Sequence, residues 1–196
     1  MKTTSKIYDL VYIAVGTVLI IICSWISIPA VVPFTLQTFA VFAVISMIGG
    51  KRGTISVLIY IILGAIGVPV FHSFTGGIGI LIGTTGGYII GFIFMGLIFW
   101  ASEVLFKEKI TSLKVNFKNI AARAVTMIIG LIVCYAFGTA WFIVAYARSN
   151  EPVGFGAALV MCVIPFIIPD LAKMAVAILI SLRVRKLLKI PQITAA

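Results

Sequence analysis

Six long apolar runs constrain the fold of this chain more than any other feature, because each must be kept away from water. They cover about residues 10–28, 36–48, 54–68, 79–106, 119–147 and 154–188. About 20 apolar residues in an α-helix span a bilayer core, where a helix satisfies its own backbone hydrogen bonds. The runs therefore predict an all-α membrane protein with six transmembrane helices in a single domain over residues 1–196.

The last run is too long for one helix, and it contains two prolines, Pro165 and Pro169. Proline is tolerated in the first turn of a helix, where its missing N–H costs little. We therefore expect a short apolar segment over 154–164 on the outer side of the membrane. A sixth helix over 166–188 follows, with Pro169 in its first turn.

Charge predicts the orientation. The chain is 10% charged, whereas soluble domains carry about 25% charge, so an ordinary soluble domain is excluded. Of the 15 Lys and Arg residues, Arg148 falls in an outer break and Lys173 lies within a run, which leaves 15 − 2 = 13 for the inner side when both termini are cytoplasmic. These thirteen are Lys2, Lys6, Lys51, Arg52, Lys107, Lys109, Lys114, Lys118, Arg123, Arg183, Arg185, Lys186 and Lys189. The net charge of +10 thus indicates membrane orientation and not nucleic-acid binding.

Asp170 and Lys173 are charged residues inside the last apolar run. An ionised side chain in hydrocarbon costs about 2.5–3.5 kcal/mol on insertion scales, so such residues face a partner, a cavity or a substrate. Three positions apart on a helix, the two project from the same face. They can hold a polar solute in the outer half of the membrane, or they can join two helices as a structural ion pair.

The segment between 76 and 91 is rich in glycine. Gly79, Gly83, Gly87 and Gly91 recur every four residues, which predicts one bare face on a continuous helix. Such a face allows close approach of another helix or of a ligand. The phosphate-binding pattern Gly-x4-Gly-Lys-[Ser/Thr] is absent, so we expect no ATP-hydrolysing site on this chain.

Catalytic and metal-binding arrangements find little support. His72, the single histidine, is interpreted as a solvated residue of an outer loop. The three cysteines, Cys23, Cys134 and Cys162, lie in apolar stretches without metal-ligand spacing. We therefore expect no enzyme activity, no metal and no cofactor.

Three separated motifs carry a family resemblance. They are Val32-Pro33-Phe34-Thr35-Leu36-Gln37-Thr38, Thr84-Thr85-Gly86-Gly87-Tyr88-Ile89-Ile90-Gly91-Phe92, and the stretch from Pro165 to Lys173. In this order the chain resembles the BioY family, the biotin-specific S components of energy-coupling factor (ECF) transporters. The resemblance implies a multi-pass protein of a prokaryotic cell membrane that binds biotin from outside. It also implies a partner ECF module, made of two ATPases and a transmembrane coupling protein.

The resemblance also implies roles for individual residues. Phe34 and Thr35 would cover the site, and Asp170 and Lys173 would make polar contacts with biotin. Other residues would line it: Gln37, Gly86, Gly87 and Tyr88. We expect the ureido N–H groups of biotin to bind Asp170. We expect its carboxylate to bind Lys173 or backbone N–H groups of the glycine-rich stretch.

S components often carry Ala-x-x-x-Ala on the first helix as a coupling surface. The corresponding residues here would be Ala14, Gly16, Thr17 and Val18, with Val18 at the second small position. An alternative function is that of a self-sufficient, ion-coupled secondary transporter of a small carboxylated solute, with Asp170 as proton carrier. A purely structural membrane subunit is a further alternative.

Overall fold

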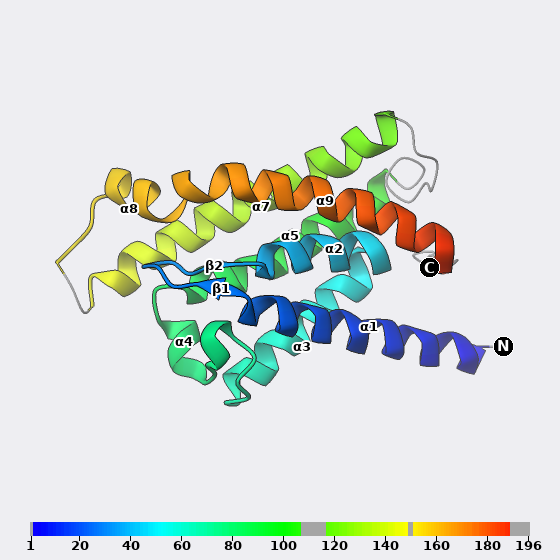
Figure 1. Ribbon diagram of the computed structural model, residues 1–196, viewed down its shortest axis with the longest axis horizontal. Helices are drawn as coiled ribbons and strands as arrows, with labels where there is room; N and C mark the ends of the chain where they lie inside the picture. The colour runs from blue at the N-terminus through cyan, green and yellow to red at the C-terminus, as the bar shows by residue number, and fades with distance from the viewer. Residues whose placement is uncertain (1, 107–116, 149–150, 189–196) are drawn as a thin grey trace.

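The computed structural model describes residues 2–106, 117–148 and 151–188 (Figure 1). Helices dominate the described residues, and a two-stranded antiparallel hairpin interrupts them near the N-terminal end. The elements in order are α1 (Lys2–Trp25), β1 (Ser27–Ile28), β2 (Phe34–Thr35), α2 (Gln37–Ile48), α3 (Gly50–Ala65), η1 (His72–Phe74), α4 (Ile78–Ile82), α5 (Gly86–Leu105), α7 (Phe117–Tyr146), α8 (Phe155–Cys162) and α9 (Ile164–Leu188).

Four described helices are long and apolar enough to cross a membrane: α1, α5, α7 and α9. The predicted helical membrane class is therefore confirmed, while six spanning helices and the cytoplasmic position of the termini stay predictions. The difference lies in α2 and α3. With 12 and 16 residues they extend only about 18 and 24 Å, less than the roughly 30 Å of a bilayer core.

Several predicted helix boundaries differ from the structure, among them the starts of α1 and α3, and two of the differences concern segments near the pocket. The expected helix over 79–106 is divided between α4 and α5, because the chain leaves the helical conformation at Gly83. The last helix begins at Ile164 and not at 166, so Pro169 lies in its second turn. The predicted short segment before it is α8, close to the expected range of 154–164.

The break at Gly83 also removes the continuous glycine face. A Cβ added at Gly79 of α4 would meet nothing within 4 Å. A Cβ at Gly91 of α5 would lie 2.7 Å from Cys134 Sγ, and one at Gly87 would overlap Trp141. Gly87 and Gly91 therefore serve the close packing of α5 on α7, in which Gly79 has no part.

This difference gives a matched pair of substitutions. We expect Gly87→Ala to destabilise the protein by about 1–3 kcal/mol, because the added methyl group must displace Trp141 in a packed core. We expect Gly79→Ala to be neutral or slightly stabilising, since it meets open space in a helix. Thermal unfolding of both variants in detergent measures the difference, and equal midpoints would contradict this account of the packing.

The short helix α2 lies at the centre of the molecule, between α9 and α1 in Figure 1. Nine of its 12 residues are buried. The core cluster around it contains large apolar side chains, among them Phe42 and Ile45 of α2 itself and Phe99 of α5, each at most 1% exposed. The position of α2 places Gln37, its first residue, under the outer surface of the molecule.

Three arginines are buried near the opposite end of α2. Arg52, Arg123 and Arg185 are at most 3% exposed, although the charge count had assigned all three to the inner side of the membrane. Arg52 forms an ion pair with Asp9 of α1. Arg123 Nη1 donates to the Ser46 hydroxyl (3.4 Å), and Arg185 Nη1 donates to the Ser46 carbonyl (3.1 Å). These contacts tie α7 and α9 to α2, and α3 to α1.

Candidate functional site

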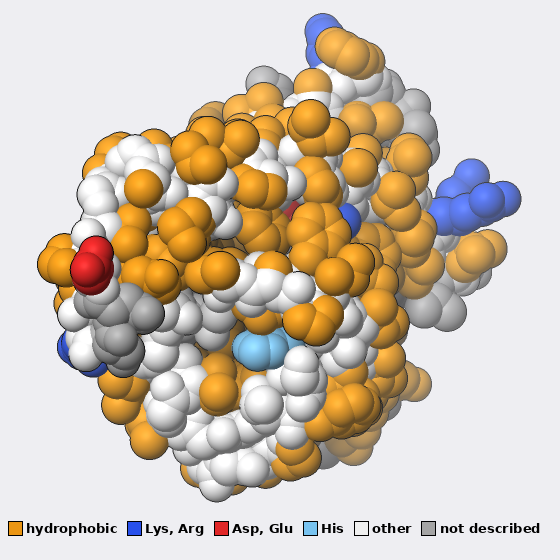
Figure 2. Space-filling view, turned by 60° about the vertical axis from the view of Figure 1, so that its left-hand side comes forward, with side chains coloured by type: hydrophobic (Ala, Val, Ile, Leu, Met, Phe, Trp, Pro, Cys, Tyr) orange, Lys and Arg blue, Asp and Glu red, His pale blue; other side chains and the backbone are white. Residues whose placement is uncertain are grey.

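A pocket opens on the face formed by the hairpin, α8 and the α4–α5 turn (Figure 2). In this view apolar side chains surround the hollow, and an acidic and a basic side chain are partly visible between them. The lining residues come from segments that are far apart in the sequence: Val32, Pro33, Thr35, Gln37, Thr38, His72, Thr85, Tyr88, Ile89, Phe92, Cys134, Tyr135, Cys162, Phe166, Asp170 and Lys173.

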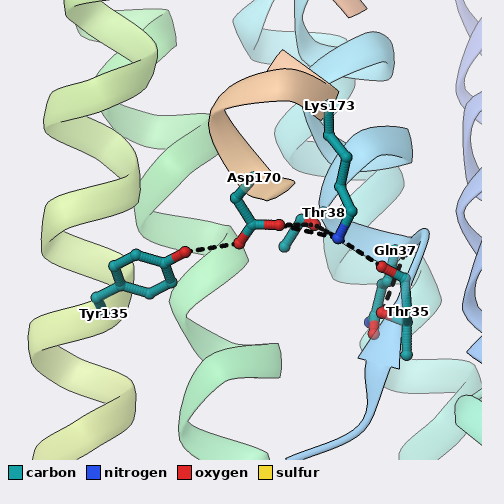
Figure 3. A network of polar contacts seen from close by, with 6 residues as sticks. All are labelled: Thr35, Gln37, Thr38, Tyr135, Asp170 and Lys173. Carbon is teal, nitrogen blue, oxygen red and sulfur yellow. Dashed lines mark hydrogen bonds and ion pairs between the residues drawn. The ribbon is translucent and has the colours of Figure 1, made fainter. Parts of the chain in front are cut away.

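Asp170 is the centre of a polar network in this pocket (Figure 3). One carboxylate oxygen, Oδ1, accepts from Lys173 Nζ (2.9 Å) and from the Thr38 hydroxyl (2.8 Å). The other, Oδ2, accepts from the Tyr135 hydroxyl (2.7 Å). Asp170 is 1% exposed, so these contacts compensate a charge that has lost its hydration.

The ammonium group of Lys173 has a hydrogen-bond acceptor for each of its N–H groups. Besides Asp170, its Nζ donates to the Thr35 carbonyl (2.8 Å) and to the Thr38 hydroxyl (3.1 Å). An ammonium group has three N–H donors, so all three are used within the protein. The Phe34 ring covers the ammonium at 4.5 Å from its centroid and stacks on Phe166. The hairpin thus closes over the lysine, and Phe34 acts from behind the pocket wall.

Gln37 has a defined amide orientation. Its Nε2 donates to the Tyr60 hydroxyl (2.8 Å), which leaves the carbonyl oxygen Oε1 as the acceptor that a ligand can use. Across the pocket, the Tyr88 hydroxyl is 3.1 Å from the Thr139 hydroxyl and shares a hydrogen bond with it. Both predicted lining residues therefore present polar atoms to the pocket from fixed positions.

Comparison with known proteins agrees with this arrangement. A sequence model of the BioY family matches residues 1–190. The chain belongs to the BioY family.

The biotin transporter BioY of Thermotoga maritima is 41% identical over 182 residues, which cover 91% of this chain and 96% of that protein. The probable biotin transporter BioY of Pyrococcus horikoshii is 39% identical over 154 residues, covering 79% of this chain and 81% of that one. Among solved structures, the crystal structure at 2.1 Å of the S-component for biotin from an ECF-type ABC transporter has a TM-score of 0.81 and 28% identity, with 95% of each chain covered. The predicted family resemblance is confirmed.

In this BioY-family chain the structure brings together five of the eight predicted site residues: Thr35, Gln37, Tyr88, Asp170 and Lys173. Gly86 and Gly87 are not among the lining residues. A Cβ at Gly86 would overlap the Leu81 carbonyl, and one at Gly87 would overlap Trp141. Both glycines lie behind the wall, where they permit close packing and leave Thr85 and Tyr88 to face the pocket.

The other lining residues were not predicted as site residues, and Thr38, Tyr135 and His72 are the ones among them that matter most for ligand chemistry. Thr38 directly follows Gln37, and Tyr135 is a polar group in an apolar run, so both carried a weak sequence signal. His72 carried none: it was interpreted as a solvated loop residue, and the structure shows that it is half-buried and also lines the pocket. Partial burial lowers the pKa of the His72 imidazole below its ordinary value.

The expected coupling surface on α1 needs correction. Ala14 and Val18 are exposed, four residues apart on one face. Thr17 is 4% exposed and donates to the Ser56 carbonyl (3.2 Å), and a Cβ at Gly16 would lie 2.8 Å from Ser56 Oγ. Gly16 and Thr17 therefore face the protein interior, because helical spacing turns them away from the face of Ala14 and Val18.

Proposed function

We propose that this chain is the high-affinity biotin-binding subunit, or S component, of an ECF-type vitamin uptake transporter in a prokaryotic cell membrane. The observation that carries the proposal is the buried network around Asp170, which lies in a pocket of a BioY-family chain. Named relatives are biotin transporters, and the similar solved structure is a biotin S-component.

The chemistry of the pocket matches the parts of biotin. A carboxylate offers about four acceptor positions, and Thr38, Tyr135 and Lys173 use three of those on Asp170. The remaining position on Oδ2 can accept one ureido N–H. The Gln37 carbonyl oxygen can accept the other. Apolar side chains supply walls for the thiophane ring and the alkyl tail: Ile89, Phe92 and Phe166.

Binding of biotin and of its analogues to the purified protein tests this function. We expect biotin to bind tightly, and desthiobiotin, which keeps the ureido ring, to bind more weakly. Lipoate has a similar tail and acid but no ureido group, so we expect no comparable binding. If lipoate bound as tightly as biotin, or if none of the three bound, the proposal would be wrong.

The proposal includes a partner module with two ATPases and a transmembrane coupling protein, since the chain itself lacks a nucleotide-binding motif. We infer that the exposed face of α1 around Ala14 and Val18 contacts this module, because a small residue allows another helix to approach closely.

We expect Ala14→Trp to leave biotin binding unchanged while reducing ATP-driven uptake severalfold, because bulk on this face separates the two helices. Val176→Trp is the matched control, since Val176 is 48% exposed on α9. Binding and uptake are measured in the reconstituted complex. Equal losses of uptake in the two variants would remove α1 from the coupling surface.

A further inference from the structure

The pocket lacks an available cation at its inner end. Asp170 and Lys173 are the charged residues that line it, and they neutralise each other. Every donor of Lys173 is already used by Thr35, Thr38 or Asp170. A ligand that carries a carboxylate therefore brings a net negative charge that Lys173 does not satisfy in this arrangement. The compensating group must come from elsewhere on the lining.

His72 is the other lining residue whose side chain can carry a positive charge. In Figure 2 the histidine, coloured pale blue, lies on the face into which the pocket opens. It comes from η1, whereas the ion pair comes from α9. The two ends of an elongated ligand can therefore meet different groups, one at the rim and one at depth.

The backbone around His72 is held in an uncommon conformation. The next two residues, Ser73 and Phe74, have φ values of 54° and 57°, which residues other than glycine rarely adopt. The His72 carbonyl accepts from both the backbone N–H (3.2 Å) and the hydroxyl (2.8 Å) of Thr75. Strained positions of this kind persist where the surrounding structure imposes them, often at ligand-binding sites.

Packing on both sides holds this turn in place. Phe71, which precedes His72, is fully buried and meets the Tyr60 ring edge-on at 5.4 Å. Phe74, which closes η1, stacks on Trp25 at 4.8 Å. The imidazole is thus presented to the pocket by a rigid turn, and Tyr60 also holds the Gln37 amide.

We propose that His72 binds the carboxylate of the ligand at the rim of the pocket, in the imidazolium form. This inference rests on the proposed function, because biotin supplies the carboxylate. It assigns the acid end of the ligand to the η1 turn, in place of Lys173 or the backbone of the glycine-rich segment.

The proposal makes the affinity for a carboxylated ligand dependent on pH. Partial burial lowers the pKa of His72 in the free protein, whereas a bound carboxylate favours the imidazolium and raises that pKa. Binding is therefore tightest below the pKa of the free protein and weakens as pH rises toward the pKa of the complex. The other ionisable groups on the lining are the Asp170–Lys173 pair and groups that ordinarily titrate above pH 8: Tyr88, Tyr135, Cys134 and Cys162. Helix α1 packs against this turn, and the ionisable group in its last two turns is the Cys23 thiol, which also ordinarily titrates above pH 8.

The experiment measures the affinities of biotin and of biotinamide, whose acid is replaced by a neutral amide, between about pH 5.5 and about pH 8. In the wild type we expect biotin to bind about tenfold more tightly at the acidic end, and biotinamide to show no such change. In His72→Gln we expect biotin to lose about tenfold at acidic pH, with biotinamide unaffected. His72→Lys should restore the affinity for biotin and abolish its dependence on pH.

Biotinamide binding reports that each variant is folded. If both ligands bind but respond equally to pH and to His72→Gln, the role of His72 is wrong while the biotin-binding function stands. If the wild type binds neither ligand, the biotin-binding function itself fails, and the inference about His72 fails with it.

Discussion

Asp170→Asn is expected to weaken biotin binding by about 2 kcal/mol or more, which corresponds to roughly 30-fold in affinity. Asparagine removes the charge and places an NH2 donor among three groups that already donate: Thr38, Tyr135 and Lys173. The ammonium of Lys173, whose side chain is 10% exposed, then lacks its counter-charge. Removing one partner of a buried ion pair typically costs about 3–5 kcal/mol, so stability falls as well.

Tyr135→Phe is the matched control for this substitution. It removes the hydrogen bond to Asp170 Oδ2 and leaves the ion pair intact, so a loss of about 1 kcal/mol in affinity is expected. Titration of both variants with biotin in detergent gives the two values. Unchanged affinity in a folded Asp170→Asn protein would remove Asp170 from the binding site.

Arg123→Ala is expected to have a comparably large effect, on stability and not directly on binding. Arg123 is fully buried, and its guanidinium donates to Ser46 of α2. Alanine leaves a cavity in its place and removes the guanidinium that bonds the Ser46 hydroxyl in the core, at a cost of about 3 kcal/mol or more.

Arg183→Ala is a suitable control, because Arg183 is an exposed arginine on α9. Surface substitutions of this kind usually change stability by about 0.5 kcal/mol or less. Chemical or thermal unfolding in the same detergent compares the two variants. If Arg123→Ala unfolded at the same midpoint as the wild type, the buried Arg123 side chain would not contribute to the stability of the protein.

Asp170 and Lys173 show what the sequence could predict. A charged pair within an apolar run is costly unless it has partners, and that cost pointed to the pocket before the fold was known. Gln37 and Tyr88 followed from motif resemblance. The partners Thr38 and Tyr135 required the fold, because they come from α2 and α7 and meet only in space.

Other features depend on packing that local patterns do not encode. Arg123 and Arg185 were counted in sequence only as charges of the inner side, yet tertiary contacts with Ser46 bury both. Gly16 looks like part of a small outer face, yet Ser56 of α3 lies against it. In each case the sequence supplies the residue type, whereas the helix rotation that decides its environment comes from neighbouring helices.

Close packing beneath the pocket restricts how a bound molecule can leave. Phe42 and Ile45, on the later turns of α2, and Phe99 of α5 belong to one buried core cluster, so opening a passage there would separate α2 from α5 at the expense of core contacts. In the described part of the chain, a ligand therefore exits through the same mouth by which it entered. We therefore expect that, among the described helices, the packed core under the pocket holds α2 against its neighbours while the mouth stays the way in and out.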